Sequence, residues 1–368
     1  MKFALIVPIL LEAFLAAEAC TEIRVIAEDK TVVMGRSMEY MIDLMSYIVV
    51  EPKAYPHTAE LAKSCTRSTS PMTWTNRYKI AYLDAWSLPV AVDGQNEAGL
   101  SVGALLFPGF SKYQVVPKSK CGSAISNLQF PLWILGNFAT AEELRRAWKK
   151  DSFPLVWERP LKGYTFELHY SITDKSGDGI IIEYTEQGPK LHENTIGVMT
   201  NSPPYDFHML NLRNYVHLSK FAHDPLVLGE TTFPPTGQGS GLLGVPGDFT
   251  PPSRLIRSAA MVHFAEKATK SDEAVNLALH VMNTVDIPRG VAGSHDHESM
   301  ADYTSWIVAK DLSNNAMYFR SYEDLTIRVI HLDKVTSDKK LKIKVGSPIG
   351  GFVDVTGDLE DAQFHTEL

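Results

Sequence analysis

The segment Ala17-Glu18-Ala19-Cys20-Thr21-Glu22-Ile23-Arg24-Val25-Ile26-Ala27 joins a leader to the first strand pattern of the chain. Upstream, Lys2 precedes an almost unbroken apolar run over residues 3–11, and Ala17 and Ala19 are small residues at the positions that signal peptidase reads. We therefore predict that residues 1–19 are a signal peptide. Cleavage between Ala19 and Cys20 would release a periplasmic or secreted chain with a single domain, residues 20–368.

Cys20 then becomes the first residue of the mature chain, with a free α-amino group beside its own thiol. An α-amine titrates near pH ~8 and a thiol near ~8.5, so both are close to a change of protonation state at neutral pH. Because the amine can act as the base for the thiol, the pattern predicts an N-terminal cysteine nucleophile. Two other interpretations stay open. One is a lipid-anchored cysteine, which Glu18 fits poorly, and the other is cleavage elsewhere, since Glu12 interrupts the leader.

Charge and cysteine content limit the classes of function. The chain has 35 Lys and Arg against 43 Asp and Glu, a formal charge of −8, and the mature chain carries about −7 because the leader holds Lys2, Glu12 and Glu18. This mild acidity, without a basic cluster, argues against a nucleic-acid partner. No apolar run after the leader is long enough to span a bilayer. Cys65 and Cys121 either form a disulfide, as an oxidising compartment allows, or are two buried thiols.

The strand pattern predicts an α+β fold of antiparallel layers. Alternate residues from Ile23 are apolar, a turn follows at 28–30, and residues 31–35 resume as the second strand of a hairpin. Strand groups are separated by helix groups, which favours antiparallel layers over alternating βαβ units. Asp93-Gly94-Gln95-Asn96 is predicted as a break. The further predicted strands are 79–86, 88–92, 100–107, 164–174, 180–185, 190–200, 303–310, 316–322 and 326–331.

Helices are predicted between these strand groups. Thr140 caps a helix that runs through Lys150, with acidic residues in its first turn. The other predicted helices are 122–137, which Pro131 weakens, 252–268 and 271–283.

Two further stretches are predicted to be loops. The segment 234–247 is rich in Gly and Pro, and its glycines lack a phosphate-binding spacing, so it reads as a surface loop and not a nucleotide site. His295-Asp296-His297-Glu298 offers two imidazoles without a third and fourth ligand. We therefore expect no metal there, and no cofactor is predicted for the chain.

Four residues besides Cys20 are candidates for the chemistry of attack on an amide. Arg36 and Glu39 follow the second strand, and if the first two strands pair, both lie beside Cys20, where an arginine favours the thiolate and a carboxylate orients the amine. Asn201 ends a strand and can donate to an oxyanion. Arg254 stands at a helix start, where a cation is unusual. Each also fits an ordinary role in an ion pair or a turn.

These residues, in this order, make the sequence similar to the choloylglycine hydrolase family, which contains bile salt hydrolases and penicillin V acylases within the N-terminal nucleophile hydrolases. Any one motif is weak, but the series is specific and spans nearly all of the mature chain. It consists of Cys20, Gly35-Arg36-Ser37-Met38-Glu39, Asn96-Glu97-Ala98-Gly99-Leu100, Leu106-Phe107-Pro108-Gly109-Phe110, Thr200-Asn201-Ser202-Pro203, His208, Asn211-Leu212-Arg213-Asn214-Tyr215, Pro246-Gly247-Asp248-Phe249, Ser253-Arg254 and Asp302-Tyr303-Thr304.

The resemblance implies a four-layer αββα sandwich, with two antiparallel sheets between helical layers. It implies that Cys20 is the nucleophile and that Arg36, Asn201 and Arg254 are active-site residues. The implied reaction is acyl transfer, in which the Cys20 thiolate attacks a non-peptide amide carbonyl while Asn201 and a backbone N–H hold the oxyanion. The Cys20 amine passes the proton to the leaving amine, and water hydrolyses the thioester. The implied partner is a small-molecule acyl amide, and the common assembly in the family is a homo-tetramer.

Two positions depart from that family, and both bear on the site. Glu39 stands where Asp is usual, which leaves its contact with the Cys20 amine open. Leu106 stands where Asn or Tyr is usual, so the oxyanion relies on the Leu106 backbone N–H or the pocket is more apolar. Met38, Leu106 and Phe107 are the predicted walls for an apolar acyl group.

The sequence leaves alternatives open for both the substrate and the activity. An exported precursor resembles the Gram-negative relatives, which favours penicillin V or an N-acyl homoserine lactone over a conjugated bile salt. The rival interpretations are a catalytically impaired binding protein on the same fold, secreted or lipid-anchored, and a cyclic-amide or peptide hydrolase.

Overall fold

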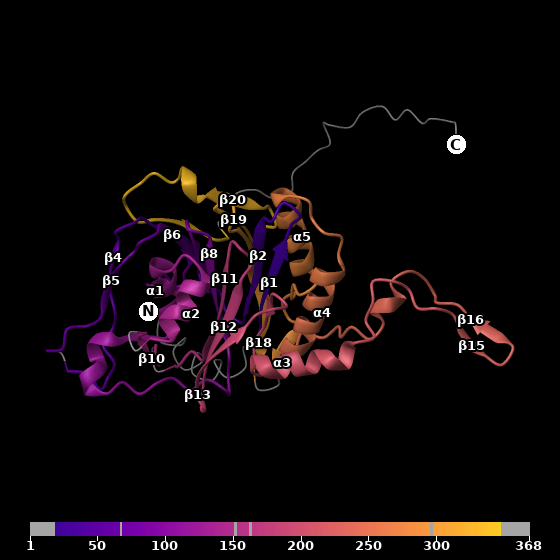
Figure 1. Cartoon of the computed structure of the whole chain (residues 1–368), viewed down its shortest axis with the longest axis horizontal. Coiled ribbons are helices and arrows are strands. Elements are labelled where there is room, and N and C mark those ends of the chain that lie inside the picture. Colours follow the sequence, from indigo (N-terminus) through magenta and orange to yellow (C-terminus); the bar gives the residue numbers. More distant parts are fainter. Residues whose placement is uncertain (1–18, 67, 151–152, 162–163, 295–296, 347–368) are drawn as a thin grey trace.

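Two large sheets lie face to face in the computed structural model, which describes residues 19–346 except 67, 151–152, 162–163 and 295–296 (Figure 1). The first sheet contains β1 (Cys20–Ile26), β2 (Val32–Tyr40), β14 (Val198–Met199), β17 (Ala292–Ser294), β18 (His297–Asp311), β19 (Ala316–Ser321) and β20 (Arg328–His331). Its order is β14-β1-β2-β18-β19-β20, with β17 paired to β18. The second contains β3 (Tyr47–Glu51), β6 (Ile80–Leu83), β7 (Asp93–Asn96), β8 (Leu100–Leu106), β11 (Leu168–Asp174), β12 (Gly179–Thr185), β13 (Gly188–Glu193) and β21 (Leu341–Lys344). Its order is β13-β12-β11-β8-β7-β6-β3-β21.

Helices cover the outer faces of both sheets, which gives the αββα sandwich (Figure 1). The helices α4 (Pro251–Phe264) and α5 (Ser271–Asn283) pack on the first sheet, and α1 (Phe130–Asn137) and α2 (Ala141–Trp148) on the second. Every strand pairing within the two large sheets is antiparallel, as predicted. The smaller elements are α3 (Tyr205–Asn211), the 3-10 helices η2 (Lys118–Ser123), η3 (Leu212–Tyr215), η4 (Ser240–Leu242) and η5 (Leu332–Lys334), and the strand pairs β4 (Pro56–Thr58) with β5 (Thr73–Thr75), β9 (Ala124–Ser126) with β10 (Leu155–Trp157), and β15 (Leu226–Leu228) with β16 (Thr231–Phe233).

The first hairpin divides its side chains between two cores. Ile23 and Val25 join the apolar cluster beneath α4 and α5. Cys20 and Met38, which are cross-strand partners, face the cluster between the two sheets. The alternation predicted from the sequence is therefore confirmed, and it aims the start of β1 into the space between the sheets.

The predicted break at residues 93–96 is wrong, because these residues form β7 in the middle of the second sheet. Two of these residues, Gly94 and Asn96, make tertiary contacts that explain their place in a central strand. A Cβ on Gly94 would lie 2.7 Å from the backbone carbonyl oxygen of Ala81 on the neighbouring strand and 2.9 Å from a side-chain carbon of Leu135 in α1, so only glycine allows this close approach. The Asn96 side chain donates to the carbonyls of Leu135 and Phe138 at the end of α1. The predicted strand 88–92 is instead irregular chain.

One predicted helix starts later than expected, two end earlier, at Phe264 and Trp148, and the helix 271–283 is confirmed. The predicted helix 122–137 is α-helical only over Phe130–Asn137, because Pro131 occupies the first turn, where its missing N–H has no cost, and residues 122–123 end the 3-10 helix η2. Residues 124–126 form the strand β9. Thr140 caps α2 by accepting a hydrogen bond from the Glu143 backbone at 3.1 Å, as predicted. The segment 234–247 is a largely exposed loop.

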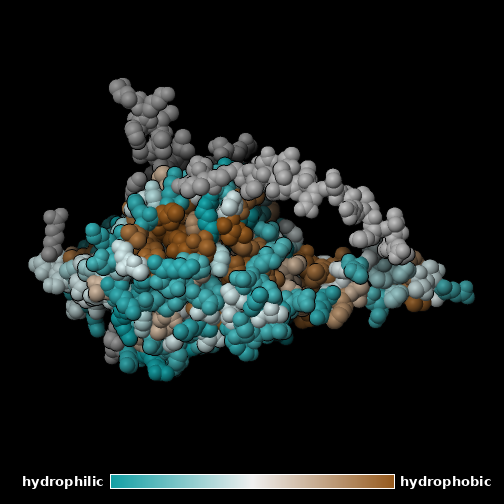
Figure 2. Space-filling model, turned by 90° about the horizontal axis from the view of Figure 1, so that it is seen from above, coloured by the Kyte–Doolittle hydropathy of each residue, from teal (hydrophilic) through white to brown (hydrophobic). Residues whose placement is uncertain are grey.

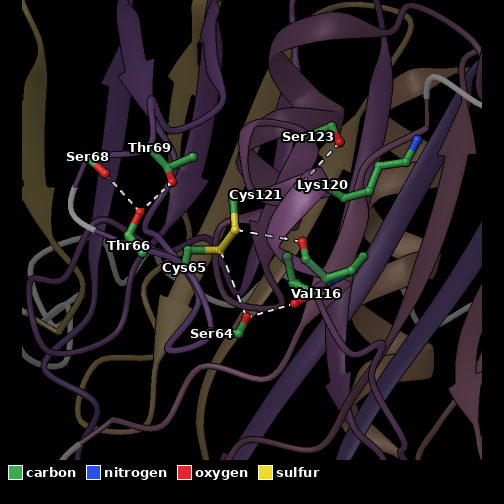
Figure 3. The surroundings of a disulfide bond; sticks show 10 residues. Ser64, Cys65, Thr66, Ser68, Thr69, Val116, Lys120, Cys121 and Ser123 are labelled. Atoms are coloured by element: carbon green, nitrogen blue, oxygen red, sulfur yellow. Dashed lines mark hydrogen bonds between the residues drawn. A yellow bond between two sulfur atoms is a disulfide. The ribbon is translucent and has the colours of Figure 1, made fainter.

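Cys65 and Cys121 form a disulfide, which resolves the alternative that the sequence left open. The bridge ties the loop after β4 to η2, and Ser64 beside it donates to the Val116 carbonyl at 2.8 Å (Figure 3). Cys20 is the free cysteine, and it is buried. Within the described ranges, no helix has both the length and the apolar character needed to cross a membrane.

Candidate active site

Cys20 begins β1 and lies between the two sheets with 1% of its surface exposed. Its thiol is 3.5 Å from Nη2 of Arg36 and 3.8 Å from Sδ of Met38, both on the neighbouring strand β2. The Leu106 backbone N–H also lies close enough to the thiol to lower its pKa. Because β1 and β2 pair in register, the hairpin itself fixes the arginine beside the sulfur.

The groups around the Cys20 thiol shift its pKa in opposite directions. Burial raises the pKa of the thiol above its ordinary value. Arg36, Arg254 and the Leu106 N–H favour the thiolate and lower the pKa, while the Glu39 carboxylate raises it. The buried thiol therefore depends on its two arginines for any thiolate character.

The Asn201 side chain links the Cys20 backbone to two other groups. Its Oδ1 accepts from the Cys20 backbone nitrogen at 2.6 Å and from Nη2 of Arg254 at 2.8 Å. Its Nδ2 donates to the Leu106 carbonyl at 2.8 Å. Arg254 also donates to the Cys20 carbonyl and, at 2.7 Å, to Oγ1 of Thr21. One amide and one guanidinium thus hold the nitrogen and carbonyl of the residue that bears the thiol.

Glu39 is fully buried beside this cluster. Its Oε1 accepts from the Thr304 hydroxyl at 2.9 Å, and its backbone N–H donates to the Ala19 carbonyl at 3.2 Å. Burial raises the pKa of Glu39 to about 7, against the opposing effect of Arg254. The Glu39 side chain therefore changes protonation near neutral pH, and the backbone of the same residue contacts the carbonyl of the peptide bond that the leader prediction expects to be cut.

Two buried histidines hold the backbone around Asn201, and the sequence reasoning gave them no role. Nε2 of His169 is 2.9 Å from the Thr200 carbonyl, and Nε2 of His208 is 2.9 Å from the Asn201 carbonyl. Glu183 connects the two, since its Oε1 lies 3.4 Å from Nδ1 of His169 and accepts from the first backbone N–H of α3, the helix that carries His208.

The charge states of this group follow from its surroundings. Burial lowers the pKa of His208 to about 4, so its ring is neutral at pH 7 and donates from Nε2. His208 and Thr304 did belong to the motif series, which was the only sequence feature that pointed to them.

The three predicted pocket walls lie at different depths. Met38 contacts the thiol and is 5% exposed, and Leu106 is partly exposed next to it. Phe107 is fully buried, and its ring stacks on His169 at 4.6 Å between centroids. Met38 therefore borders the thiol and Leu106 is the most exposed of the three, whereas Phe107 packs on the buried His169.

The stretch 295–298, which offers two imidazoles, is only partly covered by the structure. His295 and Asp296 lie outside the described residues. Among the residues that the structure does describe, no group of three or more His, Cys, Asp and Glu side chains is arranged to hold a metal ion.

The two antiparallel sheets between helical layers form the fold that the resemblance implies, and Cys20 lies in it beside Arg36, Asn201 and Arg254. The family described as linear amide C–N hydrolases, choloylglycine hydrolase family, matches residues 20–344. The chain therefore belongs to this family and is a hydrolase of carbon–nitrogen bonds in linear amides.

Individual relatives agree with this assignment. The chain is 30% identical to a bile salt hydrolase/transferase of Clostridium perfringens over 327 residues, 87% of this chain and 94% of the relative. It is 26% identical to a penicillin V acylase of Pectobacterium atrosepticum over 317 residues, 82% and 77% of the two chains. A crystal structure of a conjugated bile acid hydrolase variant from Clostridium perfringens superposes with a TM-score of 0.76 at 27% identity, covering 89% of this chain and 97% of the other.

Proposed function

We propose that this protein is an exported amidase that hydrolyses the linear C–N bond of an acylated small molecule, with Cys20 as its N-terminal nucleophile. One observation carries the proposal. The Cys20 backbone nitrogen is held at 2.6 Å by Asn201 while the thiol of the same residue faces Arg36 at 3.5 Å. Removal of residues 1–19 converts this nitrogen into an α-amine in a place that already binds it.

The proposed reaction begins when the Cys20 amine accepts the thiol proton and the thiolate attacks the substrate carbonyl. The oxyanion that forms is stabilised by the Leu106 backbone N–H, which already lowers the pKa of the thiol, and by the second Nδ2 proton of Asn201. The ammonium then returns the proton to the leaving nitrogen, the C–N bond breaks and a thioester remains. Water, deprotonated by the same amine, releases the carboxylic acid and restores the thiol.

Export is supported by two features of different kinds. The leader ends with small residues at the expected cleavage position, Ala19. The Cys65–Cys121 disulfide is the kind of bond that persists in an oxidising compartment such as the periplasm or the extracellular space. We propose that the leader is removed at the Ala19–Cys20 bond. That bond is buried in the folded chain, with Ala19 at 4% exposure, so an external peptidase has to act before folding is complete.

We propose a homo-oligomer, in which a second copy covers the arm formed by β15 and β16. Both strands of this hairpin are exposed, including Leu226, Val227, Leu228 and Phe233 at 50% or more (Figure 1). Figure 2 shows apolar residues along the arm that projects from the body. An isolated two-stranded hairpin is marginally stable in water, so a partner surface is needed to hold it. Light scattering of a Leu226→Glu/Leu228→Glu variant should show a smaller particle than the unchanged protein.

The substrate class is tested with the processed protein that begins at Cys20. Amine release is measured from glycocholate, penicillin V and a long-chain N-acyl homoserine lactone, with Cys20→Ala as the control. We expect an apolar acyl group to be preferred, because Met38 and Leu106 border the thiol. Turnover that disappears in Cys20→Ala supports the proposal and selects the substrate. Full turnover by Cys20→Ala would overturn it, and folded protein without turnover of any of the three would favour the binding-protein interpretation.

A further inference from the structure

A second group of charged side chains lies between the sheets, behind Arg36. It consists of Glu22 on β1, Asp93 on β7 and Lys310 on β18, each with 1% or less of its surface exposed. Nζ of Lys310 and Oδ1 of Asp93 form a close ion pair whose side chains are both fully buried. Because burying charge is costly unless each charge has a partner, this group has to be considered together with the Arg36 guanidinium.

Gly103 is the point at which these charges meet. It is the cross-strand partner of Asp93, and a Cβ at this position would lie 2.0 Å from Oε2 of Glu22 and 2.8 Å from Nη1 of Arg36. The Glu22 carboxylate and the Arg36 guanidinium therefore lie side by side over the bare Gly103 backbone. Glu22 and Arg36 are also directly opposite each other in the β1–β2 pairing.

The cluster reaches the reaction centre through Arg36. Burial alone would lower the pKa of Arg36, but the nearby Cys20, Asp93 and Glu22 reverse this and raise it above its ordinary value. Nε and Nη1 of Arg36 donate no hydrogen bond within the described part of the chain, so this end of the guanidinium interacts with the carboxylates through charge. Its other end, Nη2, faces the thiol and the Ala104 carbonyl.

We propose that Asp93 and Lys310, linked to Arg36 by Glu22, are positioning residues that set how much of the Arg36 charge acts on the Cys20 thiol. The negative charge of Asp93 partly neutralises the positive charge of Arg36, and the positive charge of Lys310 partly neutralises that of Asp93. The other charged groups that face Cys20 are Glu39 from β2 and Arg254 from α4, and neither belongs to this cluster. The proposal rests on Cys20 as the nucleophile, but its test does not require turnover.

The test measures the alkylation rate of Cys20 by iodoacetamide against pH, read by mass, on protein that begins at Cys20. Asp93→Asn removes a negative charge and should lower the apparent thiol pKa, whereas Lys310→Met removes a positive charge and should raise it. We expect each shift in the thiol pKa to be about half a unit or more. Charges in a protein interact at an effective dielectric of ~20, which screens them only partly. The double variant Asp93→Asn/Lys310→Met should return close to the unchanged protein.

Two further variants keep the test decisive. Glu22→Gln still accepts from Ser171 and should shift the thiol pKa in the same direction as Asp93→Asn, which covers the case in which a single variant of the ion pair does not fold. Glu51→Gln is the matched control, because Glu51 is also buried in the second sheet but binds Tyr82 and Lys340 instead, and it should cause no shift.

The outcomes separate this proposal from the proposed function. Shifts in one direction for both Asp93→Asn and Lys310→Met, or no shift in any of these variants, would overturn the role of the cluster. Full turnover by Cys20→Ala would overturn the nucleophile and leave the thiol measurement valid.

Discussion

The backbone nitrogen of Cys20 donates to Oδ1 of Asn201 at 2.6 Å, across 181 positions of sequence. This contact joins the first strand of the domain to the end of β14, its neighbour in the sheet. Arg254 completes it by donating to the same Oδ1 atom. The position of the Cys20 nitrogen is thus defined by two side chains that come from distant parts of the chain.

Replacement of Asn201 should affect the chemical step more than substrate binding. Asn201→Ala removes the acceptor for the Cys20 nitrogen and the amide that we assign to the oxyanion, so kcat should fall by roughly 10²–10³, as loss of an oxyanion donor does elsewhere. Steady-state kinetics of the processed protein check this. An unchanged kcat with a raised KM would show that Asn201 only binds substrate.

His208 should act through Asn201, because its Nε2 holds the Asn201 carbonyl at 2.9 Å. His208→Leu should lower kcat about tenfold, the cost of leaving a buried carbonyl without its donor, with little change in KM. His208→Gln keeps a donor and should recover most of the activity.

A matched control for His208 exists on another helix. Nε2 of His263 is likewise 2.9 Å from a backbone carbonyl, that of Ile196, but away from the site. His263→Leu should leave kcat unchanged. Equal losses in the two leucine variants would contradict the positioning role of His208.

Much of this arrangement could be predicted from the sequence, because it depends on residues that are close together in the chain. The alternation from Ile23 and the turn at 28–30 define a hairpin, and the hairpin brings Arg36 to Cys20. The packing of β7 could not be predicted, because its residues are turn formers whose partners, Leu135 and Lys310, lie far away in sequence. The histidines behind Asn201 were missed for the same reason, since a ring that binds one backbone carbonyl leaves no local pattern.

Glu39 should make the stability of the chain depend on pH. Its pKa is raised to about 7 in the folded chain, against an ordinary value of 4.5. The folded state therefore holds the proton more tightly, and the resulting stabilisation is fully present below pH 4.5 and is lost as pH rises to 7. Over that range Glu39 should account for a loss of up to about 3 kcal/mol in the free energy of unfolding.

Urea unfolding of chains that retain Ala19 measures this contribution. The Glu39→Gln variant should show a smaller loss of stability between the acidic and neutral ends of the range than the unchanged chain. Parallel pH profiles for the two chains would show that folding does not raise the pKa of Glu39.

The disulfide should contribute to stability and not to catalysis. Cys65 and Cys121 are 56 residues apart, and closing a loop of this length stabilises the folded state by about 4 kcal/mol in the chain-entropy description. Cys65→Ser/Cys121→Ser should lower the free energy of unfolding by about this amount at unchanged kcat. A large fall in kcat in protein that is still folded would place the loop in the site.

The central claim is that Cys20 reacts as an N-terminal residue, and one matched pair of proteins tests it. One begins at Cys20, and the other keeps Ala19 as an extra first residue, which the folded structure accommodates by a hydrogen bond from the Glu39 backbone to the Ala19 carbonyl. Both have the same thiol, but only the first has a free amine on Cys20. With intact mass measured alongside, hydrolysis of the preferred amide by the first and none by the second is the predicted result. Equal turnover by the two proteins would contradict the account.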